Sequence, residues 1–96
     1  MTHIDYAVVW PLLTVIMMIT GAQIRAARAF AQISANDLAS LAHIARTTVV
    51  RAELTNAVPP TTTANLLAIQ NALEKLGVTF GADGSVNYHQ PMAGDS

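Results

Sequence analysis

The feature that most limits how this chain can fold is the three- and four-residue spacing of apolar side chains between Gly21 and Leu54. Such spacing gathers apolar residues on one side of an α-helix. The pattern is interrupted at Ser34 and again at residues 43–45. The segment therefore predicts three short helices around a shared core, and the residues expected to face inward are Ile24, Ala27, Ala31, Leu38, Leu41, Ala42, Val49 and Ala52.

Signals for helix ends support these boundaries. The hydroxyl of Ser34 can accept from the N–H of Asn36 or Asp37, and Asp37 at the third helical position is similar to the acidic member of a capping box. A third helix is expected to run from about Arg46 to Leu54. Its start, Arg-Thr-Thr after a short turn, gives the segment the spacing of a helix-turn-helix.

The second half of the chain predicts a loop, a fourth helix and a strand or hairpin. Residues 58–60 read Val-Pro-Pro and cannot lie inside a helix. Thr61 or Thr62 is expected to cap a helix from Thr63 to Leu76, which Gly77 would end. Its apolar face is expected to comprise Leu66, Leu67, Ile69, Leu73 and Leu76.

Residues 78–88 contain β-forming residues on both sides of an Asp-Gly pair, which is typical of a hairpin. We therefore expect a mainly α fold: a small helix-turn-helix bundle of four to five helices with a C-terminal β-strand or hairpin. Residues 20–77 would form the helical domain, residues 78–88 the hairpin and a candidate dimerisation element, and residues 89–96 a disordered tail.

Residues 1–19 form an apolar N-terminal extension. The run Tyr6–Ala22 carries no charge and is about as long as the shortest membrane spans, but Pro11 interrupts it. Without Lys or Arg before it or a clear small-residue cleavage site after it, the run is a poor secretory signal. Three interpretations stay open: an upstream extension with the true start at Met17 or Met18, an element packed on the domain or in a dimer, and a membrane anchor, which is the least favoured.

Composition narrows the class of function. The 96-residue chain has no cysteine, which excludes disulfides and thiolate metal sites and fits a cytoplasmic protein. The formal net charge is only −1, yet Asp37 is the single acid between Gly21 and Ala52, where four of the five basic residues lie. This asymmetry indicates a basic face on the helical segment.

No catalytic, metal or cofactor site is expected. The three histidines, His3, His43 and His89, have no ligand spacing, and no nucleophile–base arrangement or glycine-rich phosphate loop is present in the sequence. We therefore do not expect an enzyme. A short helix that begins with arginine and threonine can instead enter the major groove, where arginine reads guanine and threonine contacts a thymine methyl.

The segment IRAARAFAQISANDLASLAHIARTTVVRAE, residues 24–53, resembles the phage-repressor (Xre/Cro-like) helix-turn-helix family. The stretch TTANLLAIQNALEKLGVTF, residues 62–80, is similar to short bacterial regulators of that family, and the whole resemblance covers about Thr20 to Tyr88. It implies a transcriptional regulator that binds a palindromic operator in double-stranded DNA as a homodimer, with a recognition helix at about residues 45–54.

The resemblance also implies roles for single residues. Arg28 and Glu53 match a structural salt bridge between the first and third helices, and Ala39 matches the small residue where two helices approach. The residues that match or lie near DNA-contacting positions are Arg46, Thr47, Thr48, Val50, Arg51, Ser34 and Arg25. Of these, Ser34 and Arg25 would contact phosphate, and Arg25 could equally be an ordinary surface residue.

Three positions depart from the family pattern. Ala35 replaces a glutamine that contacts phosphate, His43 replaces a turn glycine, and Ala45 replaces a capping serine or threonine. These departures and the low net charge favour an alternative from another class, a protein-interaction module such as an antitoxin or antiactivator on the same scaffold.

Overall fold

The computed structural model describes residues 18–89, which form four α-helices followed by an antiparallel hairpin. The elements are α2 (Gly21–Ala31), α3 (Ala35–Ala42), α4 (Arg46–Ala52), α5 (Thr63–Lys75), β1 (Val78–Phe80) and β2 (Val86–Tyr88). The expected mainly α bundle with a C-terminal hairpin is confirmed. The predictions for residues 1–17 and 90–96 lie outside the described part.

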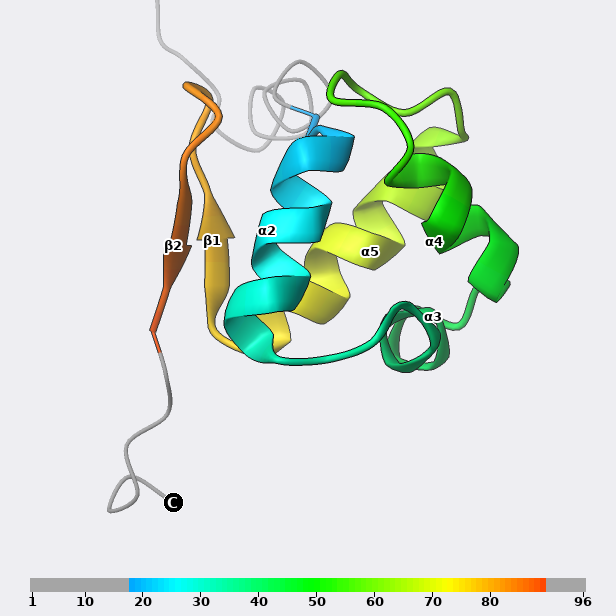
Figure 1. Cartoon of the computed structure of the whole chain (residues 1–96), viewed down its shortest axis with the longest axis horizontal. Coiled ribbons are helices and arrows are strands. Elements are labelled where there is room, and N and C mark those ends of the chain that lie inside the picture. The colour runs from blue at the N-terminus through cyan, green and yellow to red at the C-terminus, as the bar shows by residue number, and fades with distance from the viewer. Residues whose placement is uncertain (1–17, 90–96) are drawn as a thin grey trace, which may run out of the picture.

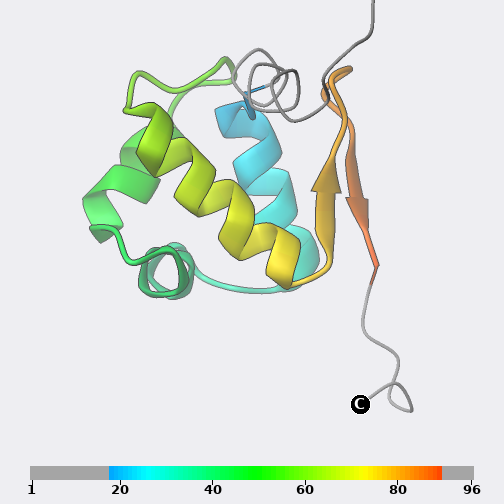
Figure 2. The same ribbon diagram turned by 180° about the vertical axis from the view of Figure 1, so that it is seen from behind.

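Helix α5 is central to the bundle. It contacts α3 on one side and α2 and β1 on the other, and α3 also packs against α4. Figures 1 and 2 show the hairpin beside α2 at one end of the molecule and the α3–α4 unit at the opposite end, with β2 as the outer strand. Across residues 18–89, no helix has the length and apolarity that a membrane crossing requires.

The core consists of aliphatic side chains from every helix, from β1 and from the residues just before α2. Its largest fully buried members are Ile19, Ile24, Leu38, Val49, Ile69, Leu73 and Val78. Small residues fill the close approaches between helices: Ala27, Ala39, Ala42, Ala52 and Ala72. The spacing in the sequence therefore predicted most of the core.

The structure differs from the predicted core and helix ends at several positions. Leu67 and Leu76, expected on the apolar face of the fourth helix, are half-buried and are not members of the core. Leu41 is 49 % exposed, because Leu38, Ala39 and Ala42 define the buried arc of α3 and Leu41 falls outside it. Helix α4 ends at Ala52, two residues before the expected end, so that Leu54 follows the helix in a turn and is 79 % exposed.

The start of α2 is fastened to the hairpin by one buried polar side chain. Gln23 is 5 % exposed, and its Oε1 accepts from the backbone N–H of Thr20 at 2.9 Å in a capping box. Its Nε2 donates to the carbonyl oxygens of Gly81 and Ser85, both at 3.1 Å. The amide thus joins the N-terminus of the bundle to the hairpin loop.

Replacing Gln23 with glutamate is expected to destabilise the domain by about 1.5 kcal/mol at neutral pH, because both hairpin carbonyls lose a donor and face a carboxylate instead. A glutamate retains the acceptor for the Thr20 N–H, so the change isolates the contact with the hairpin. Chemical denaturation measures the loss. The exposed amide Gln32 provides the matched control, and an equal loss in Gln32→Glu would contradict this assignment.

Candidate nucleic-acid interface

The first helix of the helix-turn-helix unit starts at a complete capping box. The Oγ of Ser34 accepts from the Asp37 N–H at 3.0 Å, and the Ser34 N–H donates to the Asp37 carboxylate at 3.1 Å. The second bond and, to a smaller degree, the Ser34 hydroxyl hold the pKa of Asp37 below its ordinary value. The box therefore stabilises α3 at neutral pH, and this contribution is lost when the pH falls through the lowered pKa.

The turn between α3 and α4 is tight and strained at one residue. His43 has φ 58° and ψ 43°, the left-handed conformation that glycine adopts most readily. It allows the Ile44 N–H to donate to the carbonyl of Ala39 at 3.0 Å, which closes the end of α3. Ala45 then starts α4 without a side-chain cap, as its sequence predicts.

Replacing His43 with glycine is expected to stabilise the domain by about 0.5–1 kcal/mol, because glycine adopts the left-handed conformation without a steric penalty. Gln32, at the end of α2, has φ 59° and should respond in the same direction. Ser40 is an exposed residue inside α3, where glycine should destabilise by about the same amount. Thermal denaturation measures all three changes, and destabilisation by His43→Gly would show that the imidazole makes a contact essential to the turn.

Helix α4 has one buried and one outward face. Val49 and Ala52 point into the core, whereas Arg46, Thr47 and Arg51 are exposed. Thr48 and Val50 are half-buried at the borders of the outward face. Within residues 18–89, the guanidinium groups of Arg46 and Arg51 form no hydrogen bond or salt bridge, so both are available to an external partner.

The expected ion pair between Arg28 and Glu53 is present. Nε and Nη2 of Arg28 donate to the two carboxylate oxygens of Glu53, both at 2.8 Å, and Nη1 donates to the carbonyl of Ile33 at 3.1 Å. Hydrogen bonding to Glu53 is the main reason that the pKa of Arg28 is raised. The pair holds the end of α4 against α2 and so sets the orientation of α4.

Arg25 has a role that the sequence did not indicate. Its guanidinium donates to the carbonyls of Glu53 and Thr55 and to the side chain of Asn56, all in the segment directly after α4. These contacts tie that segment to α2. Contact between Arg25 and phosphate stays a prediction, and these bonds give the side chain a structural role that neither interpretation of the sequence included.

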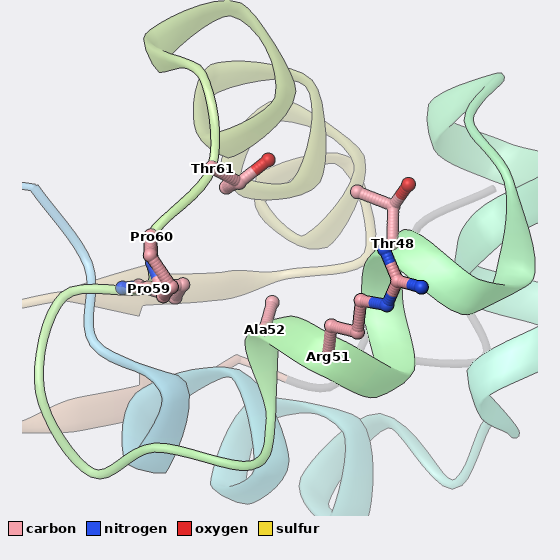
Figure 3. Close-up of a pocket in the computed structure, with 6 residues that line it drawn as sticks. All are labelled: Thr48, Arg51, Ala52, Pro59, Pro60 and Thr61. Atoms are coloured by element: carbon pink, nitrogen blue, oxygen red, sulfur yellow. The ribbon is translucent and has the colours of Figure 1, made fainter.

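A small pocket of about 150 Å³ lies between α4 and the loop that precedes α5. Its lining residues are Thr48, Arg51, Ala52, Pro59, Pro60 and Thr61 (Figure 3). In the sequence, the two prolines indicate only that a helix cannot continue there. The pocket is not evident from the sequence, because its lining residues meet only after the loop has folded back onto α4.

Several large apolar side chains stay exposed in the described residues. Leu54 and Val58 lie on the segment after α4, and Phe30 on α2 stacks against Tyr88 of β2 with ring centroids 6.2 Å apart. No group of three or more His, Asp or Glu side chains within residues 18–89 is arranged to hold a metal ion.

The described residues thus present a short helix with two unpaired arginines on its outward face, held by an ion pair and by a tight turn. That arrangement can contact an anionic polymer through α4 and its flanking helix ends.

Comparisons with protein-family models, with curated proteins and with solved structures found no match to this chain. The geometry of the α3–α4 unit is therefore the main structural observation that bears on function.

Proposed function

We propose that this chain is a sequence-specific DNA-binding transcriptional regulator whose recognition helix is α4. The observation that carries the proposal is the outward display of Arg46, Thr47 and Arg51 on a helix whose opposite face is fixed in the core. A helix held in this way fits the major groove, where arginine reads guanine with two hydrogen bonds and threonine contacts a thymine methyl. The resemblance to the phage-repressor family supports the same function.

Contacts to the DNA backbone would come from the ends of two helices. Ser34 is exposed at the start of α3, and its hydroxyl proton is available to a phosphate while its oxygen accepts from Asp37. The α3 N-terminus adds the partial positive charge of unpaired backbone N–H groups. The start of α5 lies across the pocket from α4 and provides a second such end.

The proposed regulator acts in the cytoplasm as a homodimer. A palindromic operator with half-sites about one helical turn apart matches such a dimer. The outer strand β2 is the proposed pairing element, because Val86, Asn87 and Tyr88 carry none of the charges or prolines that usually protect an edge strand.

Recovery of bound DNA tests this function directly. We expect the full chain, purified from its host under mild salt, to carry DNA fragments enriched in one inverted-repeat sequence. Fluorescence anisotropy with that duplex should give a Kd that rises steeply with salt concentration, since phosphate contacts release counterions. Unenriched fragments together with equal affinity for random duplexes would contradict sequence-specific binding.

A second candidate is a protein-interaction module, such as an antitoxin or antiactivator. The observation that favours it is the exposure of Leu54 and Val58 directly after α4, where an apolar partner surface could pack. The two candidates separate by mutation. If Leu54→Ser abolishes the regulation of transcription in cells but leaves the DNA affinity unchanged, a protein partner is favoured. If regulation is lost only when the α4 arginines are replaced, DNA is favoured.

A further inference from the structure

The pocket between α4 and the loop before α5 has one polar and one apolar side. Ala52, Pro59 and Pro60 supply the apolar wall. The polar side consists of the guanidinium of Arg51 on α4 and the hydroxyl of Thr61 on the far side of the cleft (Figure 3). Thr48 also lines the pocket from α4, but its methyl group lies toward the prolines and its hydroxyl points away from them (Figure 3). Residues more than ten positions apart in the sequence therefore converge on one small volume.

The polar groups are oriented as donors. The Oγ1 of Thr61 accepts from the Nδ2 of Asn65 at 3.1 Å, so its own proton is left to donate elsewhere. Arg51 carries donors only, and no acidic residue lines the pocket. The nearest acid along the chain, Glu53, is already bound to Arg28. A pocket that contains a guanidinium and a free hydroxyl proton, and that has no carboxylate of its own, favours an anion as its ligand.

We propose that this pocket is a binding site for a single oxyanion, either a phosphate or a carboxylate group. The guanidinium of Arg51 matches the planar, two-oxygen geometry of such a group, and the hydroxyl of Thr61 adds a donor from the opposite side. The volume holds one such group, with any apolar part of the ligand against the prolines.

The site has a consequence for regulation that rests on the proposed function. Arg51 belongs both to the pocket and to the outward face of α4. The oxyanion can therefore be a phosphate of the DNA backbone, in which case the pocket is part of the DNA interface. It can also be a free anionic molecule, in which case its binding removes Arg51 from the DNA and weakens the complex.

Titration of the free full-length chain with inorganic phosphate, at ionic strength held constant with NaCl, tests the site without DNA. In ¹H–¹⁵N spectra we expect shifts concentrated at Thr48, Arg51, Ala52 and Thr61. Arg51→Gln should weaken phosphate binding by about tenfold or more, as expected for loss of a charge-assisted bond. Shifts spread over the whole surface, or shifts unchanged in Arg51→Gln, would overturn the proposal.

Matched controls separate the pocket from general surface charge. Arg46→Gln removes an equal charge from α4 outside the pocket lining and should leave phosphate binding within about twofold. Thr61→Val removes one hydroxyl and should weaken binding by about fivefold, whereas Thr63→Val should not. Equal effects within either pair would refute a defined site.

The DNA arm identifies the source of the oxyanion. If the Thr61 amide shifts on adding the recovered duplex and Thr61→Val weakens the complex, the anion is a backbone phosphate. If Thr61→Val leaves the affinity for the duplex unchanged, and phosphate weakens the DNA complex of the native chain but not that of Thr61→Val, the anion is a free molecule. Pocket shifts with phosphate but no DNA binding would refute the proposed function alone, and DNA binding without phosphate shifts would refute the pocket alone.

Discussion

Replacing Arg46 and Arg51 together with alanine is expected to lower the affinity for the recovered DNA by at least about thirtyfold, because each arginine contributes about 1–3 kcal/mol at a base or phosphate. Both side chains are exposed and form no hydrogen bond within residues 18–89, so the fold should not depend on them. Fluorescence anisotropy measures the affinity, and circular dichroism with thermal denaturation checks the structure.

Lys75→Ala is the control for charge alone. Lys75 is also exposed but lies at the C-terminal end of α5, far along that helix from the end that faces α4. It should change the affinity by less than about threefold, and it should leave the salt dependence almost unaltered. Each arginine removed from a phosphate contact should reduce the slope of the logarithm of the binding constant against the logarithm of the salt concentration by about one. An operator affinity that survives the double substitution would remove α4 as the recognition helix.

Features encoded within a few residues could be predicted from the sequence. The Ser34–Asp37 box and the start of α5 after Thr62 both depend on neighbours in the chain. The left-handed turn at His43 was implied only by the family resemblance, which has glycine at that position. The apolar spacing predicted the core of α2, α4 and α5, because a helix turns by a constant angle at each residue. The Arg28–Glu53 pair is a long-range contact, and it was found through the family resemblance rather than from spacing.

Features that arise when distant segments meet could not be predicted in this way. Gln23 bonds to carbonyls 58 and 62 positions away, and nothing in its local sequence marks it as buried. From the sequence alone Arg25 cannot be distinguished from an ordinary surface arginine, because its partners lie on the segment after α4, which comes beside it only in the folded chain. The same holds for the pocket, whose two sides lie on α4 and on a loop that the sequence defines only by its prolines.

Glu53→Ala is expected to destabilise the domain by about 3 kcal/mol. The Glu53 side chain is 9 % exposed and that of Arg28 27 %, so truncation leaves a partly buried guanidinium without its two carboxylate bonds. The raised pKa of Arg28 means that the charged guanidinium in this pair stabilises the fold at neutral pH, far below the ordinary pKa of arginine. Urea denaturation at neutral pH measures the loss.

A double-mutant cycle isolates the pair from the other bonds of its partners. Arg28→Met removes the charge but keeps apolar bulk, and Glu53→Gln keeps one acceptor. If the bidentate pair fixes the orientation of α4, the coupling energy should reach about 1–3 kcal/mol, and Arg28→Met should lower DNA affinity although Arg28 is not one of the proposed DNA contacts. Additive losses would instead mean that the Arg28 contact with the Ile33 carbonyl and apolar packing hold α4 in place, with the salt bridge incidental to its orientation.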